Sequence, residues 1–276
     1  MVLPELYGFD AYSPKELAER VENAGINKAR LPLFPMLLLA ILAGAFIGLG
    51  GLYYTLVAAD AALDFALVRV VGGLVFSLGL LLVVVAGAEL FTGNNLLVIA
   101  WADGRISTLE LLRNWLVVFC GNFIGAAGLA VLVFLSGHAD MNHGLVAEQY
   151  VKIAAAKCTM SFWPAFFKAI LCNALVCLAV WMAMAGRSVT DKAIAIVFPI
   201  SAFVAAGFEH SVANMYFIPM GMLLQPSMTV VPHAEMIGWA GFAANLLPVV
   251  LGNIVGGSVL VGGVYYVIYR GGKRPS

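Results

Sequence analysis

Six long apolar stretches, separated by short polar segments, dominate this chain. Four of them, residues 33–57, 109–135, 162–185 and 241–268, are close to the roughly 20 residues that a helix needs to cross a bilayer core of about 30 Å. A helix satisfies its own backbone hydrogen bonds, which is why such stretches form helices in lipid. The pattern therefore predicts four continuous transmembrane helices.

The other two apolar stretches, residues 70–101 and 193–224, are too long for one simple crossing. Each would extend roughly 48 Å as a continuous helix at about 1.5 Å per residue. Each also has glycine and polar residues near its middle, in residues 87–95 and 207–214. Irregular backbone at membrane depth persists only where protein buries it or where it lines a wet cavity. We therefore predict that the second and fifth transmembrane helices are broken.

The composition excludes several classes of protein. The 276 residues are 62% hydrophobic and 11% charged, whereas soluble globular proteins have about 25% charged residues. A formal net charge of zero provides no basic field, so we expect no nucleic-acid partner. The four cysteines form no Cys-x-x-Cys pair, and we expect no disulfide framework, metal or cofactor. The first thirty residues are polar and do not have the pattern of a signal peptide.

Polar segments flank the apolar stretches at both ends of the chain. Ser-Pro-Lys-Glu at residues 13–16 is a capping box with proline at the first helical position, which predicts a helix to about Arg30. This helix is too polar to span, and we expect it along the membrane surface or against the bundle. Residues 1–32 are predicted to form a cytoplasmic segment and residues 270–276 a cytoplasmic tail.

The basic residues predict the orientation. One side of the membrane has only Arg69, Lys152 and Lys157. The side that holds both chain ends has eleven basic residues: Lys15, Arg20, Lys28, Arg30, Arg105, Arg113, Arg187, Lys192, Arg270, Lys273 and Arg274. Cytoplasmic segments carry the excess of basic residues. We expect a multi-pass protein of a prokaryotic plasma membrane with both termini in the cytoplasm.

The two halves of the chain resemble each other at three landmarks. Pro35 with Ala-Ile-Leu at 40–42 corresponds to Pro164 with Ala-Ile-Leu at 169–171, and residues 87–90 correspond to 207–210. An Asn-x6-Gly-Asn-x2-Gly pattern begins at Asn114 and again at Asn245. Three helices per half is an odd number, so the second half must be inverted. This predicts a transport domain of residues 33–269, made of repeats 33–136 and 161–269, with its permeation site near the midplane.

A few polar residues within the apolar stretches are candidates for function. His210 is the only histidine in such a stretch, and we favour a pore role over packing because intramembrane ionisable groups usually mark a pathway. Glu89 and Glu209 occupy equivalent breaks, where holding exposed N–H groups is favoured over proton relay. Asn173 and Asn214 are candidate partners of His210 or of the broken backbone.

Lys157 is the remaining charged candidate. It precedes the fourth span, where it could hold an anion at the pore mouth or merely extend its charge to the membrane surface. Its position alone does not separate these two roles.

Three segments resemble one known family. Residues 84–93 (Val-Val-Ala-Gly-Ala-Glu-Leu-Phe-Thr-Gly) are similar to the first signature of the formate/nitrite transporter family. Residues 169–179 resemble the second signature, with Ala174 where a larger apolar residue is usual, and residues 207–215 resemble the family's second helix break. With Asn114-Trp115 and Gly121-Asn122, the resemblance covers about residues 33–269.

The resemblance implies an all-α, aquaporin-like protomer of six transmembrane helices, assembled as a homopentamer with one pore in each protomer. It implies that Leu90, Phe91 and Thr92 lie on a loop that breaks the second helix, that His210 is the central histidine, and that Lys157 is the vestibule lysine. The apolar constrictions would comprise Phe76, Leu80, Leu90, Phe91 and Phe203, and the pore would also include Thr92, Asn173 and Asn214.

These features predict a non-enzymatic passage for small monovalent anions, formate first, through the lipid bilayer. His210 would protonate the anion between two apolar constrictions. Nitrite, hydrosulfide, lactate and acetate are alternative substrates, and both channel and proton-coupled carrier mechanisms stay open, as does the direction of transport. An intramembrane enzyme is disfavoured because there is no His-Glu-x-x-His motif and only one buried histidine. A water or glycerol channel is disfavoured because the paired Asn-Pro-Ala breaks of that family are missing.

Overall fold

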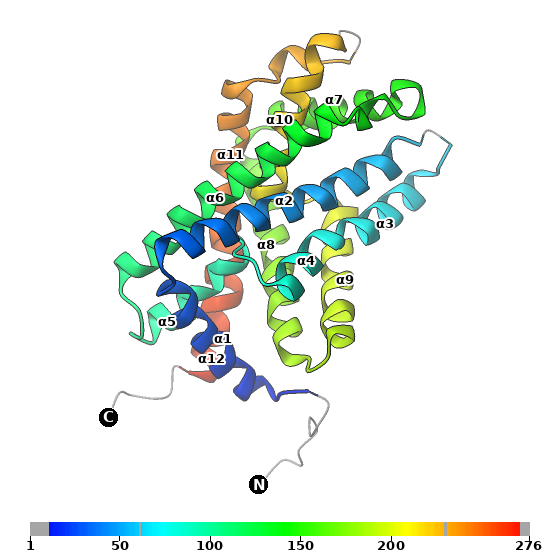
Figure 1. Cartoon of the computed structure of the whole chain (residues 1–276). Helices are drawn as coiled ribbons and strands as arrows, with labels where there is room; N and C mark the ends of the chain where they lie inside the picture. The colour runs from blue at the N-terminus through cyan, green and yellow to red at the C-terminus, as the bar shows by residue number, and fades with distance from the viewer. Residues whose placement is uncertain (1–10, 61, 229–230, 271–276) are drawn as a thin grey trace.

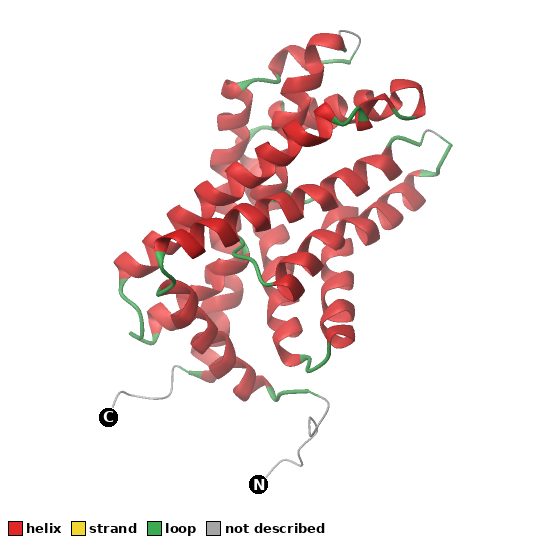
Figure 2. Ribbon diagram, viewed as in Figure 1, coloured by secondary structure: helices red, strands yellow, loops and turns green. Residues whose placement is uncertain are grey.

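The computed structural model describes residues 11–60, 62–228 and 231–270. Within these ranges the ordered backbone is helical, apart from one isolated β-bridge between Ala11 and Gly186 (Figures 1 and 2). Six helical segments in the described chain are long and apolar enough to cross a membrane, which confirms the predicted all-α membrane fold. They are α2 (Leu33–Ala58), α3 (Phe65–Phe76) with α4 (Leu78–Ala86), α6 (Thr108–Leu135), α8 (Phe162–Ala185), α9 (Val189–Ala206), and α11 (Trp239–Ile254) continued by the π-helix η6 (Val255–Gly263) and α12 (Val264–Tyr269).

Both predicted helix breaks are present, and each begins at a glycine in the left-handed conformation. α4 ends at Gly87 with a φ of 82°, and α9 ends at Gly207 with a φ of 73°. Glycine adopts positive φ without the steric cost that a Cβ imposes, so these two residues fix where the helices stop. After the first break the chain continues as the 3₁₀-helix η1 (Gly93–Leu97) and α5 (Val98–Ala102), and after the second as α10 (Ser211–Leu224).

The two halves of the chain use equivalent close helix contacts. α2 packs against α6, and α8 packs against α11 and η6. A Cβ added to Gly125 of α6 would lie 1.8 Å from the carbonyl oxygen of Ile41, and one added to Gly256 of η6 would lie 2.2 Å from that of Ile170. Small residues permit such close approach of two backbones in a membrane bundle. The inverted repeat is therefore visible in the packing as well as in the breaks.

Replacing Gly125 with alanine should destabilise the protein strongly. The atom in the way is backbone, so α2 and α6 would have to separate, and overpacking of this kind costs about 1–3 kcal/mol or more. We expect the unfolding temperature of the detergent-solubilised protein to fall by about 5 °C or more. Gly128→Ala in the same helix is the matched control, because its added Cβ meets no atom of the described residues within 4 Å beyond its own stretch of helix backbone. Equal unfolding temperatures for the two variants would contradict this account of the packing.

The predicted N-terminal helix is α1 (Pro14–Ala29), and the capping box of Ser13 and Glu16 is formed. Leu17 and Val21 are buried in a cluster that includes Trp181 of α8 and Val261 of η6. Of the two predicted locations, the one against the bundle is therefore correct. α1 and α12 lie at the same end of the molecule (Figure 1).

A charged cluster ties α1 to the end of the last helix. Arg270 forms ion pairs with Glu22 at 2.5 Å, with Glu19 at 3.2 Å and with Asp103 at 3.4 Å, and Arg105 pairs with Glu22 at 3.4 Å. Burial raises the pKa of the Glu22 carboxyl, and the neighbouring Asp103 raises it as well, whereas Arg270 lowers it. These contacts join the two ends of the described chain.

Two features were not predicted from the sequence. α7 (Leu145–Cys158) occupies a segment that was expected to be loop, so Lys157 lies in the last turn of a helix. The helix between Phe65 and Ala86 is interrupted at Ser77, whose hydroxyl donates to the carbonyl oxygen of Gly73 at 3.1 Å. A serine bond to the preceding turn commonly bends a helix.

Candidate functional site

His210 lies at the second break, immediately before α10. Its Nδ1 accepts a hydrogen bond from the backbone N–H of Ala213 at 3.1 Å, so the side chain caps the helix. Because Nδ1 is an acceptor, the proton of the neutral ring lies on Nε2. Nε2 is 2.9 Å from the hydroxyl oxygen of Thr92, which comes from the first break. The two breaks therefore meet through one hydrogen bond, and both side chains are buried.

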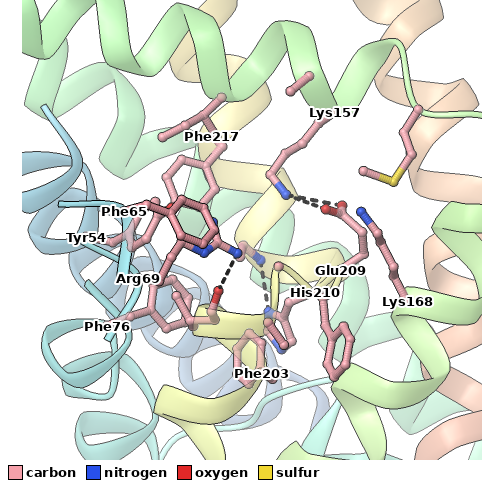
Figure 3. Close-up of a pocket in the computed structure, with 18 residues that line it drawn as sticks. Tyr54, Phe65, Arg69, Phe76, Lys157, Lys168, Phe203, Glu209, His210 and Phe217 are labelled. Atoms are coloured by element: carbon pink, nitrogen blue, oxygen red, sulfur yellow. Dashed lines mark hydrogen bonds and ion pairs between the residues drawn. The ribbon is translucent and has the colours of Figure 1, made fainter. Parts of the chain in front are cut away.

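A narrow apolar chamber adjoins the imidazole of His210. It has a volume of about 10 Å³, close to the minimum that one water molecule needs. Apart from His210 its lining is hydrocarbon, from Ile47, Phe76, Leu80, Leu90, Val176, Ile200 and Phe203. The ring of Phe203 stacks on the imidazole with centroids 5.9 Å apart, and the rings of Phe76 and Phe203 are 5.8 Å apart (Figure 3). This chamber is small and, apart from the imidazole, apolar.

Two larger cavities lie on either side of the chamber. The first, which we call the Lys157 vestibule, has a volume of about 410 Å³ and shares Phe76, Phe203 and His210 with the chamber. The second, which we call the Lys28 vestibule, has a volume of about 430 Å³ and shares Leu80 and Leu90 with it. Four of the five predicted constriction residues thus stand between the chamber and the vestibules: Phe76 and Phe203 on one side, Leu80 and Leu90 on the other.

The lysine and the glutamate that line each vestibule belong to the same kind of hydrogen-bond network with two buried asparagines. In one, Lys157 pairs with Glu209 at 3.0 Å, Asn214 donates to Glu209 at 2.7 Å and to Asn245 at 2.7 Å, and Asn245 donates to the carbonyl oxygen of Lys157 at 3.0 Å. The ion pair is drawn in Figure 3. The closed ring holds the carboxylate through side chains on three different helices.

The network in the other vestibule is equivalent. Lys28 pairs with Glu89 at 2.6 Å, Asn94 donates to Glu89 at 2.7 Å and to Asn114 at 2.9 Å, and Asn114 donates to the carbonyl oxygen of Lys28 at 3.1 Å. Lys28 was not among the site residues predicted from the sequence. A usable signal existed, because Lys28 precedes Pro35 by the same interval as Lys157 precedes Pro164.

Two further buried asparagines hold the broken backbone. Asn122 of α6 accepts from the backbone N–H of Phe91 at 2.9 Å and donates to the carbonyl oxygens of Ala40 at 2.7 Å and Glu89 at 2.9 Å. Asn253 of α11 makes the equivalent bonds to Ser211 at 3.0 Å, Ala169 at 2.9 Å and Glu209 at 3.0 Å. Backbone groups at membrane depth are costly when unpaired. These two amides satisfy three such groups each.

Asn173 and Phe91 are the remaining predicted site residues. Asn173 donates to the carbonyl oxygens of Thr92 and Asn253 and to the side chain of Asn95, so it bonds to the broken backbone, which is one of its two expected partners, and it makes no hydrogen bond to His210. Phe91 lines none of the three cavities, and its ring packs on Trp115 and Phe119. Its ring therefore lies against α6, and its predicted place in a constriction stays a prediction.

The two glutamates also have other partners than those predicted. Within the described residues the carboxylates of Glu89 and Glu209 bind lysine and asparagine side chains, and no backbone N–H donates to them. The prediction that they hold N–H groups at a half-helix start is wrong. That role belongs to Asn122 and Asn253.

A six-span helical protein in which two helix breaks enclose a dry chamber between two cavities is a membrane transport protein of the pore-forming kind. The family model for formate/nitrite transporters matches residues 15–267. The chain belongs to the formate/nitrite transporter family, which is a family of transporters and not of enzymes.

Several relatives resemble the whole chain. It is 40% identical over 263 residues to the formate channel FocA of Haemophilus influenzae, covering 91% of this chain and 93% of the relative. It is 40% identical over 272 residues to FocA of Escherichia coli K12, covering 95% of each. Among solved structures, a pentameric formate channel with formate bound matches with a TM-score of 0.80 at 40% identity, over 86% of this chain and 97% of that one. An FNT family ion channel matches with a TM-score of 0.82 at 31% identity, over 92% and 98%.

Proposed function

We propose that this protein carries formate across a plasma membrane, and that the anion crosses the chamber as the neutral acid. The observation that carries the proposal is a single imidazole in a chamber of about 10 Å³, between two vestibules that each hold a lysine. The names of the relatives, which include formate channels of two bacteria, support formate as the substrate.

Protonation is favoured because the chamber is dry. Moving a bare carboxylate into such surroundings costs several kcal/mol even after relaxation. The reference pKa values of an imidazole and a simple carboxylate differ by about 3, so moving a proton from imidazolium to the anion costs roughly 4 kcal/mol in water. Dry surroundings reduce this difference, because they disfavour both charged partners. Neutral passage therefore has the lower barrier.

The neighbouring groups suggest how the step is organised. Lys157 draws the anion toward the chamber, and the imidazole of His210, whose Nε2 is hydrogen-bonded to the hydroxyl of Thr92, is the polar group that meets it there. A proton that arrives on Nδ1 would point at the N–H of Ala213, so a charged ring has to release that N–H. Loading His210 with a proton is thus linked to the first turn of α10.

The size of the chamber favours the smallest substrates. About 10 Å³ suits a one-carbon acid better than acetate or lactate, which add a methyl group or more to a tightly packed site. Nitrite and hydrosulfide stay as alternatives, since both are small anions of weak acids.

We propose further that the protein is a homopentamer, as the solved formate channel is. Each protomer would then have its own pore, with the end that bears α1 in the cytoplasm.

Formate flux into proteoliposomes tests the proposal. Uptake by the purified wild-type protein should rise as the external pH falls from about 8 to about 5, because proton supply limits neutral passage. Nitrite and hydrosulfide serve as competing substrates in the same assay, and acetate and lactate should be slower. Uptake that is indifferent to pH over this range would contradict the proton-linked mechanism. Water permeability without anion flux would contradict the proposed substrate.

A further inference from the structure

The two vestibules are equivalent in the repeat but differ in charge. In the Lys28 vestibule, Lys28 and Glu89 form an ion pair, and no other charged side chain of the described residues lines the cavity. In the Lys157 vestibule, Lys157 and Glu209 form the same pair, but Arg69 and Lys168 line the cavity as well. The formal charge of the lining is therefore zero in one vestibule and +2 in the other.

Among the cations that line the Lys157 vestibule, Lys168 is the one whose N–H donors are not bonded to the described residues. It lies half-buried on α8, and its ammonium forms no hydrogen bond or ion pair with the described part of the chain. Arg69, in contrast, donates from Nε to the carbonyl oxygen of Ala205 at 2.7 Å and from Nη2 to that of Val204 at 3.1 Å. Figure 3 shows Lys168 beside Glu209, on the side of the cavity opposite Arg69.

The equivalent position in the other repeat has no charge. The carbonyl oxygen of Lys168 accepts from the N–H of Glu209 at 3.5 Å, and the carbonyl oxygen of Leu39 accepts from the N–H of Glu89 at 3.2 Å. Leu39 lines the Lys28 vestibule, as Lys168 lines the Lys157 vestibule. One position, leucine in one repeat and lysine in the other, accounts for half of the difference in charge.

We propose that Lys168 makes the Lys157 vestibule an anion-capture site with a higher affinity than the Lys28 vestibule. A cleft lined by one sign of charge raises the local concentration of counter-ions, and an ammonium with free donors forms charge-assisted hydrogen bonds to a carboxylate. This inference rests on the proposed transport of formate. It means that the pore saturates at a lower formate concentration from the Lys157 face than from the Lys28 face.

Detailed balance adds a second expectation. In a passive pore with equal pH and no voltage, Vmax/KM must be the same in both directions. A site that binds formate more tightly at one face therefore lowers both KM and Vmax for transport that starts at that face. A difference in KM without a difference in Vmax would contradict a capture site.

Transport into right-side-out and inside-out vesicles tests the inference. Lys168→Leu introduces the residue that the other repeat has at this position. It should raise the KM for formate from the Lys157 face about three- to fivefold, because one partly exposed charge pair contributes a binding free energy of that size. KM from the Lys28 face should stay unchanged. Lys168→Arg should keep the low KM, and Leu39→Lys should lower KM from the Lys28 face. The effects should shrink as ionic strength rises.

A control and two outcomes complete the test. Lys152→Leu removes a cation that is paired with Glu148 and does not line the vestibule, so it should change neither KM. The inference would be overturned if wild-type vesicles transported formate with equal KM values from both faces and if neither Lys168→Leu nor Leu39→Lys changed those values. The proposed transport function would stand in that case. Absence of formate flux from the wild type would overturn the proposed function, and the inference with it.

Discussion

Formate uptake at about pH 5 should fall about a hundredfold when His210 is replaced by asparagine, and the remaining uptake should not increase as the pH falls. Without a titratable group in the chamber, the anion has to cross as a charged species. Each 1.4 kcal/mol of added barrier is a factor of ten in rate, and a desolvation cost of about 3 kcal/mol beyond the wild-type barrier gives the expected factor.

Asparagine is the informative replacement because it preserves the local fold. The side chain of His210 caps α10 by accepting from the N–H of Ala213. Asparagine is among the best residues at such a position, so it can supply the same acceptor from its side-chain oxygen. The unfolding temperature of His210→Asn should therefore stay within a few degrees of the wild type.

Flux in proteoliposomes across a pH series is the measurement. His143→Asn is the matched control, because His143 is exposed in the short 3₁₀-helix η3 (Asn142–Gly144) before α7 and has a positive φ of 54°, which asparagine tolerates well. This control should keep both the rate and the pH response. A His210→Asn protein that retains the wild-type pH profile would show that the proton does not come from this imidazole.

Replacing Asn122 with leucine should remove about 3–5 kcal/mol from the free energy of unfolding. The two side chains have similar size, but leucine leaves the N–H of Phe91 and the carbonyl oxygens of Ala40 and Glu89 without their partner. Each buried polar group left unpaired costs about 1–3 kcal/mol. The backbone of the first break can partly relax, so the total loss in the free energy of unfolding is smaller than the sum of three full costs for unpaired groups.

Asn253→Leu should behave in the same way, because it removes the equivalent three bonds at the second break. The unfolding temperature in detergent and the yield of folded protein are the measurements. Asn23→Leu provides the control, since Asn23 is exposed on α1 and leucine is a good helix former. If either buried variant unfolds at the wild-type temperature, the asparagines do not hold the breaks.

The spans and breaks were predictable because lipid imposes simple requirements. Length and apolar composition identify the crossing helices, and Gly87 and Gly207 mark where regular backbone must end. The repeated landmarks correctly placed His210 and the two glutamates at the breaks. The inversion followed from the odd number of spans per half, and it required no knowledge of contacts.

Other features depend on contacts that one sequence does not reveal. Lys28 belongs to a helix with a polar face, where a basic residue indicates orientation, and only the fold brings it to Glu89. Residues 145–158 mix charged residues with alanine, a pattern without a clear apolar face, which is why α7 was missed. Phe91 lies next to two pore residues, yet the direction of its ring depends on the turn and on Trp115 and Phe119.

Leu90 and His210 hold the same place in the two repeats and both line the chamber. At these two equivalent positions the chamber therefore has an isobutyl group and an imidazole whose Nε2 is bonded to Thr92. On the proposed mechanism, a carboxylic acid that enters would turn its oxygen atoms toward the imidazole and its C–H bond toward hydrocarbon. The exchange of a single residue between the repeats thus gives a two-fold architecture a polarity, and the proposed substrate would have one preferred orientation.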